Sequence, residues 1–233
     1  AVNPAVNAIV SLREPEVLLS AARAADQQPV DQRGPLFGLP IAIKDLANAK
    51  GFATSHGSPI FAGKIAKKDD LMVARIRAAG AIVIGKTNTP EMGLGSHTFN
   101  PVFGATRNPY DISRSAGGSS GGAAAALATG MLAIADGSDM MGSLRNPAAW
   151  NNVYGFRPTW GCVPSEPEGD VFLHQLSTSG PMARSPEDVL MLLRVMAGPD
   201  PRMPNSRAAQ DLPHKLKGDL RGKRFAWLGD WGG

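Results

Sequence analysis

The sequence predicts an α/β fold with a mixed, largely parallel central sheet covered by helices. Segments with helical periodicity alternate with short apolar segments that are typical of buried strands, which is the usual order in such folds. The chain has 233 residues, 43% of them hydrophobic, enough for one large core. Glycine and proline are spread throughout without forming a linker. We therefore expect one domain over residues 1–233 rather than two small ones.

The first half of the chain contains two predicted helix–strand pairs. Residues 1–25 have apolar positions separated by polar ones, which favours a helix, and the apolar run 39–43 predicts a buried strand. Residues 70–79 predict an amphipathic helix that Gly80 ends. Residues 81–84 follow as a second buried strand.

The second half repeats this alternation. The alanine-rich residues 122–127 predict a helix, and residues 131–135 predict a strand. Ser185, followed by proline and two acidic residues, marks the start of another helix. Residues 224–228 resemble a buried strand that enters a glycine-rich turn, after which no partner element follows. We therefore expect the domain to be incomplete at its C-terminus, as the N-terminal part of a longer domain.

Composition and charge argue against several classes of partner. The formal net charge is only +4, and the longest basic cluster, Lys64 with Lys67 and Lys68, is followed directly by two aspartates, as in a solvated loop. No apolar run approaches the length of a membrane span. The one cysteine, Cys162, excludes an internal disulfide and fits a reducing compartment. We expect a cytoplasmic protein that binds neither nucleic acid nor a membrane.

Two features point to catalysis. In residues 117–122 four glycines surround Ser119 and Ser120, an arrangement for which core packing offers no obvious reason. Such a run lets backbone N–H groups surround a small negative group, especially at the start of a helix. Lys44 ends an apolar strand, where burial would lower its pKa. Together these features suggest a serine nucleophile activated without histidine.

Other chemistries fit the sequence less well. The glycine run lacks the Gly-Lys-Ser/Thr ending of a phosphate-binding loop and the spaced glycines of a dinucleotide site. The histidines are neither at metal-ligand spacing nor in a nucleophile-elbow motif, so we assign them no role: His56, His97, His174 and His214. We expect neither a metal nor an organic cofactor.

Five blocks of motifs follow one another along most of the chain: residues 34–45, 85–91, 117–122, 137–139 with 142–145, and 179–184. In type and order these blocks resemble the amidase signature family, whose members are serine hydrolases that cleave the carbon–nitrogen bond of amides. The resemblance implies a catalytic lysine at Lys44, a serine preceded by a cis peptide bond at Ser119, and the nucleophile at Ser143. It also implies an acyl-enzyme intermediate on Ser143 and a small-molecule amide as substrate.

The resemblance further assigns the residues around the nucleophile. Backbone N–H groups of the preceding loop are expected to bind the oxyanion, namely those of Met140, Met141, Gly142 and Ser143. Three side chains are expected to support the site rather than react: Ser120, Asp139 and Arg145. Family members commonly have Gly-Gly-Ser where this chain has Met141-Gly142-Ser143, so a methionine beside the nucleophile bears on substrate preference.

The resemblance leaves three functions open. The first is a stand-alone amidase, and residues 146–152 look closer to bacterial amidases such as the aminohexanoate cyclic-dimer hydrolases. The second is the amidotransferase component that supplies ammonia for tRNA-dependent transamidation, although Asn146 stands where those proteins tend to have glutamine. The third is an inactive fragment of an amidase. A homodimer also stays open.

Overall fold

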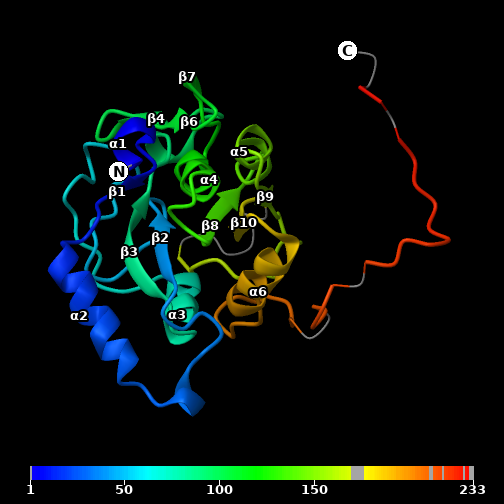
Figure 1. The fold of residues 1–233 in the computed structure, drawn as a ribbon, viewed down its shortest axis with the longest axis horizontal. Helices are drawn as coiled ribbons and strands as arrows, with labels where there is room; N and C mark the ends of the chain where they lie inside the picture. Colours follow the sequence, from blue (N-terminus) through cyan, green and yellow to red (C-terminus); the bar gives the residue numbers. More distant parts are fainter. Residues whose placement is uncertain (1, 169–175, 210–211, 217, 228, 231–233) are drawn as a thin grey trace.

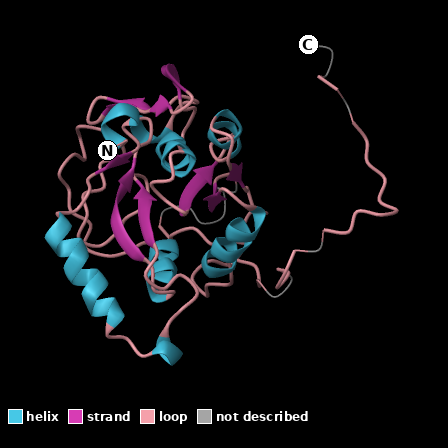
Figure 2. Ribbon diagram, viewed as in Figure 1, coloured by secondary structure: helices cyan, strands magenta, loops and turns pink. Residues whose placement is uncertain are grey.

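The computed structural model describes residues 2–168, 176–209, 212–216, 218–227 and 229–230. Two three-stranded sheets form its centre (Figures 1 and 2). The first has the order β1 (Ile9–Val10), β3 (Ile82–Thr87), β2 (Pro40–Lys44), and the second has the order β8 (Ile134–Asp139), β10 (Thr178–Ala183), β9 (Tyr154–Gly155). Two small hairpins lie apart from them: β4 (Phe99–Asn100) with β5 (Gly104–Ala105), and β6 (Arg107–Asn108) with β7 (Asp111–Ser115).

The two central sheets meet where β2 and β8 lie side by side. At this junction the backbone N–H of Lys44 donates to the side chain of Asp136 instead of to a strand carbonyl. Only β2 and β3 pair in parallel among the named strands, because the helix α3 (Leu71–Ala78) crosses between them. The other paired strands are antiparallel, so the α/β class is confirmed while the expected largely parallel sheet is not found.

Helices cover both faces of this strand layer. Besides α3, they are α1 (Asn3–Val6), α2 (Pro15–Asp26), α4 (Gly121–Ala128), α5 (Arg145–Trp150) and α6 (Pro186–Met196), with single 3-10 turns at η1 (Val30–Gln32) and η2 (Glu91–Gly93). The helix predicted from residue 185 is confirmed, since Ser185 Oγ accepts a hydrogen bond from the Asp188 amide at 3.2 Å. The helices predicted at 70–79 and 122–127 are confirmed as α3 and α4.

Alternation along β2 divides the core and orients the site. Ile41 and Ile43 face the cluster that α3 and α6 cover, whereas Ala42 faces the cluster built around the alanines of α4. Side chains two residues apart on a strand share a face. Lys44 therefore points toward α4, which begins directly after the two serines of the glycine run.

The long N-terminal helix predicted for residues 1–25 is wrong. The chain turns at Asn7, whose φ is +51°, and the side chain of Asn3 accepts the amides of Ala8 and Ile9. This turn releases Ile9 and Val10 to pair with β3. The helix begins again only at Pro15 and ends at Asp26.

Two strand predictions also need correction. The strand expected at 131–135 begins later, at Ile134, and continues to Asp139, so the polar residues before the nucleophile loop belong to the sheet. Residues 224–227 form no strand, and Trp227 is 92% exposed, because nothing in the described chain packs against it. Leu228 lies outside the described residues. Figure 1 shows this C-terminal segment extending away from the body.

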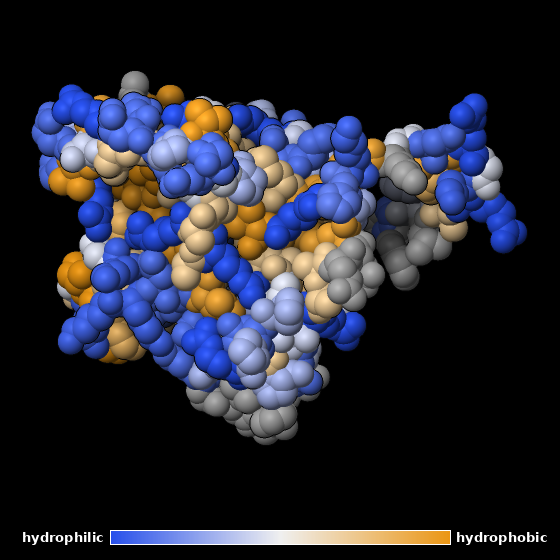
Figure 3. Space-filling view, turned by 90° about the horizontal axis from the view of Figure 1, so that it is seen from below, coloured by the Kyte–Doolittle hydropathy of each residue, from blue (hydrophilic) through white to orange (hydrophobic). Residues whose placement is uncertain are grey.

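The surface in Figure 3 is covered mostly by hydrophilic residues, with apolar side chains between them. Across the described ranges, no helix has both the length and the apolar character required to cross a bilayer.

Candidate active site

Lys44 lies at the end of β2 with only 1% of its surface exposed. Its Nζ atom donates to three hydroxyl oxygens: Ser119 Oγ at 2.8 Å, Ser120 Oγ at 2.9 Å and Ser138 Oγ at 3.0 Å. The two adjacent serines come from the loop before α4, and Ser138 comes from β8. The amine is therefore enclosed by hydroxyls from two separate parts of the chain.

Burial lowers the pKa of Lys44 from 10.5 to about 7, although the carboxylates of Asp136 and Asp139 act in the opposite direction. A substantial fraction of the side chain is therefore uncharged at neutral pH. An uncharged amine 2.8 Å from a hydroxyl oxygen can accept its proton. The lowered pKa expected for a strand-end lysine is found here.

Ser119 is 2% exposed and follows a cis peptide bond from Gly118, as the family resemblance implies. The N–H groups around the start of α4 are occupied by protein atoms: Ser120 N donates to Ser143 O at 3.1 Å, Gly121 N to Thr98 Oγ1 at 3.1 Å, and Gly122 N to Asn88 O at 3.2 Å. The helix start is thus not a free anion site, in agreement with the rejection of a phosphate loop.

Close packing explains the glycines of this run, contrary to the sequence-based interpretation. A Cβ atom on Gly122 would lie 2.6 Å from the carbonyl oxygen of Ala8, and one on Gly118 would lie 3.0 Å from the amide nitrogen of His97. A Cβ on Gly121 would collide with Thr98. The glycines permit close backbone approach, which brings Ser119 and Ser120 against the strand layer.

Ser143 lies in the loop between β8 and α5. Its carbonyl oxygen accepts a hydrogen bond from the amide of Ser120, the residue that follows Ser119. Its hydroxyl forms no hydrogen bond with another described residue. The structure therefore brings Lys44 and Ser119 into direct contact and joins the backbone of Ser143 to that of Ser120, whereas no hydrogen bond links the Ser143 hydroxyl to either serine.

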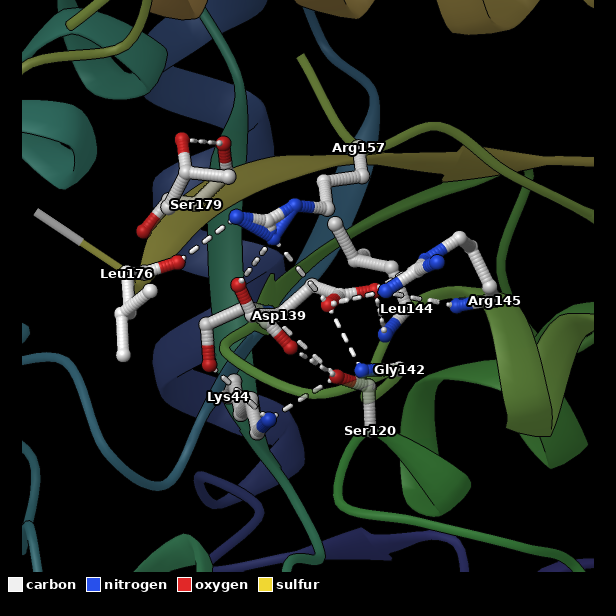
Figure 4. A network of polar contacts seen from close by, with 11 residues as sticks. Lys44, Ser120, Asp139, Gly142, Leu144, Arg145, Arg157, Leu176 and Ser179 are labelled. Carbon is white, nitrogen blue, oxygen red and sulfur yellow. Dashed lines mark hydrogen bonds and ion pairs between the residues drawn. The ribbon is translucent and has the colours of Figure 1, made fainter. Parts of the chain in front are cut away.

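Asp139 organises the loop that carries Ser143 (Figure 4). Its fully buried carboxylate accepts the amides of Gly142 at 2.8 Å and Leu144 at 3.1 Å, and it forms a bidentate pair with Arg145 at 3.0 and 3.1 Å. Burial raises the pKa of Asp139, but the hydrogen bonds from Arg145 and the two amides outweigh it and lower the pKa to about 2. Asp139 is therefore ionised at neutral pH.

The backbone amides expected to bind the oxyanion differ in whether another group already accepts their hydrogen bond. The Gly142 N–H is already engaged by Asp139, so it is not free for an oxyanion in this arrangement. The amides of Met140, Met141 and Ser143 donate to no other residue within the described ranges. The side chain of Met141 is 86% exposed, so it points away from the core.

Sequence analysis missed three polar residues of this site. Ser138 contacts Lys44 Nζ, and Asp136 accepts the Lys44 backbone amide. Arg157 donates to the carbonyl oxygen of Asp139 at 3.2 Å and to Leu176 O at 2.7 Å. Alternation along a correctly bounded β8 would have placed Asp136 and Ser138 on one face, whereas nothing local marks Arg157.

The described histidines take no part in the hydrogen bonds of this cluster. Neither His56 nor His97, which pack against Phe61 and Trp150, hydrogen-bonds to Lys44 or the serines. His174 lies outside the described residues. A buried lysine of lowered pKa between serine hydroxyls, in an α/β fold, is the kind of site that hydrolases use when lysine replaces histidine as the base.

Comparison with known proteins identifies the family. The family model described as "Amidase" matches residues 1–232, so the chain belongs to the amidase family. It is 42% identical to an acylamidase from Rhodococcus erythropolis, over 97% of this chain and 48% of that protein. It is also 42% identical to a glutamyl-tRNA(Gln) amidotransferase subunit from Methylobacillus flagellatus, over 96% of this chain and 46% of that protein.

Solved structures agree with this assignment. The fold matches that of 6-aminohexanoate cyclic dimer hydrolase complexed with substrate with a TM-score of 0.78 and 35% identity, over 89% of this chain and 42% of that one. The chain spans about half the length of the curated relatives it matches. Equal identity to an acylamidase and to an amidotransferase does not separate the branches of the family.

Proposed function

We propose that this protein hydrolyses a carbon–nitrogen amide bond through an acyl-enzyme on Ser143, with Ser119 and Lys44 as the activating groups. The observation that carries the proposal is the 2.8 Å contact between Lys44 Nζ and Ser119 Oγ, at a buried amine whose pKa is about 7. The site needs a base that is uncharged near neutral pH, and Lys44 meets that requirement.

The reaction begins with uncharged Lys44, which accepts the proton of Ser119 as Ser119 takes the proton of Ser143. The Ser143 oxygen then bonds to the amide carbonyl carbon. Return of the proton through Ser119 to the amide nitrogen allows the carbon–nitrogen bond to break, so an amine leaves instead of an amide anion. Water, activated by the same relay, hydrolyses the ester. In this scheme the Ser143 hydroxyl turns toward Ser119 when substrate binds, since apo contacts of this kind often tighten only in the complex.

Backbone amides stabilise the oxyanion in this scheme. Those of Met140, Met141 and Ser143 are the available donors. Each such donor stabilises the transition state by about 3 kcal/mol. Gly142 instead uses its N–H on Asp139 and, with φ at +116°, gives the loop its turn. Ser120, Asp139 and Arg145 support the lysine and the loop without reacting.

Labelling with a fluorophosphonate probe tests the proposal in the full-length gene product. We expect covalent modification of Ser143, located by mass spectrometry, and loss of labelling in Ser143→Ala but not in Ser113→Ala, an exposed serine of β7. Lys44→Ala should abolish amide hydrolysis with the fold intact, whereas Lys67→Ala, at an exposed lysine, should not. Labelling at another serine, or hydrolysis by Lys44→Ala, would contradict the scheme.

A second candidate is the ammonia-supplying component of a tRNA-dependent amidotransferase, which the 42% identity to a glutamyl-tRNA(Gln) amidotransferase favours. Copurification with a partner and glutamine-dependent ammonia release would support it. A stand-alone amidase instead hydrolyses small aliphatic, aromatic or cyclic amides alone, so a hydrolysis screen separates the two. An inactive protein would show neither activity and no labelling.

A further inference from the structure

Asp136 occupies an unusual position at the junction of the two central sheets. It is 1% exposed, and its two carboxylate oxygens lie 3.1 and 3.3 Å from the backbone nitrogen of Lys44. The amide at the end of β2 would otherwise face β8 without an acceptor, at a cost typical of unsatisfied buried groups. The carboxylate thus takes the place of a strand partner on the β8 side of Lys44, which pairs with Thr87 of β3 on its other side.

Residues of β8 contact Lys44 both at its backbone amide and at its side-chain amine. Asp136 and Ser138 are two positions apart and share a face of the strand. One accepts the backbone amide of Lys44, and the other accepts a hydrogen bond from its Nζ atom at 3.0 Å. The main chain and the amine are therefore both oriented by a single strand.

Two cations act on Asp136. Lys44 lies on β2 and Lys86 on β3, and the field of both favours the ionised carboxylate. Lys86 is also fully buried and lies 3.9 Å from Asp45. From the other neighbouring elements the facing groups are uncharged, since β10 places Pro181 opposite Asp136 and the loop before α4 contributes serine hydroxyls. Asp139 on β8 is the second carboxylate that acts on Lys44.

We propose that Asp136 is a positioning residue for the relay: it orients Lys44 and sets the pH range in which the amine is uncharged. This inference rests on the proposed function of Lys44. The carboxylate favours the charged amine and keeps the pKa of Lys44 from falling further below about 7. Burial raises the pKa of Asp136 to about 6, which is still below that of Lys44, so the carboxylate is largely ionised at the pH where Lys44 loses its proton.

Asp136→Asn separates these roles. The asparagine oxygen still accepts the Lys44 amide, but the negative charge is removed. The pKa of Lys44 should therefore fall. The rate of fluorophosphonate labelling increases with pH as Lys44 loses its proton, so in the variant this increase should begin at a lower pH than in the wild type. We expect the acid limb, the low-pH side of the plot of labelling rate against pH, to shift to lower pH by about 1 unit. At a fixed pH on that limb, labelling should be about tenfold faster than in the wild type.

Asp70→Asn is the matched control. Asp70 is a partly buried carboxylate that accepts hydrogen bonds from Asn48, and its charge acts on Lys86 rather than on Lys44. Its acid limb should match that of the wild type. An unchanged or raised acid limb in folded Asp136→Asn would overturn the inference while leaving wild-type labelling of Ser143, and thus the proposed function, intact.

Folding is checked by circular dichroism before each profile is measured. Asp136→Ser, a smaller neutral variant, supplies a second measurement and should move the acid limb in the same direction. If neither neutral variant folds, Asp136 serves the fold and the proposed control of pH dependence is rejected. Absence of labelling in the wild type would instead reject the proposed function.

Discussion

Replacement of Asp139 by asparagine tests how the nucleophile loop is stabilised. The ionised carboxylate accepts the Gly142 and Leu144 amides and a bidentate pair from Arg145. Its pKa falls from 3.8 to about 2 in the folded protein. Since one pKa unit corresponds to about 1.4 kcal/mol, the ionised form contributes about 2 kcal/mol to the free energy of unfolding at pH 7.

The sign of the pH dependence follows from the lowered pKa. The contribution is complete above pH 3.8 and is lost as the pH falls through about 2, where the folded protein also binds the proton. Urea unfolding should therefore show Asp139→Asn destabilised by about 2 kcal/mol at pH 7, with the difference from wild type shrinking below pH 3.8. Asp111→Asn, at an exposed carboxylate, should change little. Equal stability at pH 7, or a constant difference down to pH 2, would refute this account.

Two further substitutions test a close packing contact beside the site and the N-terminal cap of α6. Gly122→Ala should lower the free energy of unfolding by about 1–3 kcal/mol, because the new Cβ would press on the Ala8 carbonyl oxygen. Gly218→Ala, with open space around it, is the control, and equal thermal midpoints for the two variants would contradict the packing explanation. Ser185→Ala should cost about 1 kcal/mol through loss of the α6 cap, measured by chemical unfolding. No loss there would show that the Ser185 hydroxyl contributes nothing net.

Local signals were sufficient for several elements. The Ser-Pro-Glu-Asp start at 185–188 specifies its own helix because the cap, the proline and the acidic residues all act within one turn. The apolar run that ends at Lys44 forms the buried strand β2, shifted by one residue from the predicted 39–43. The amidase family was likewise identified from the order of short motifs, which the comparison with the family model confirms.

Elements that depend on distant partners were predicted poorly. The apolar periodicity of residues 1–25 contains no sign that Ile9 and Val10 pair with β3. The apolar residues at 224–227 resemble a strand, but a strand needs a neighbour to bind its backbone groups, and the described chain provides none. The glycines of residues 117–122 were interpreted as an anion site because their packing partners could not be recognised in the sequence. The backbone atoms that lie against them belong to distant residues, Ala8 and His97.

Residue types and short spacings are local properties, so they were enough to predict the α/β class, the family, and the lysine and serines that we propose for catalysis. The surroundings of the Lys44 amine could be read only from the folded chain. Asp136 and Ser138 are more than 90 residues away along the chain, at separations of 92 and 94. The pKa of an amine depends on burial and on nearby charges in space, and the order of residues alone does not specify these.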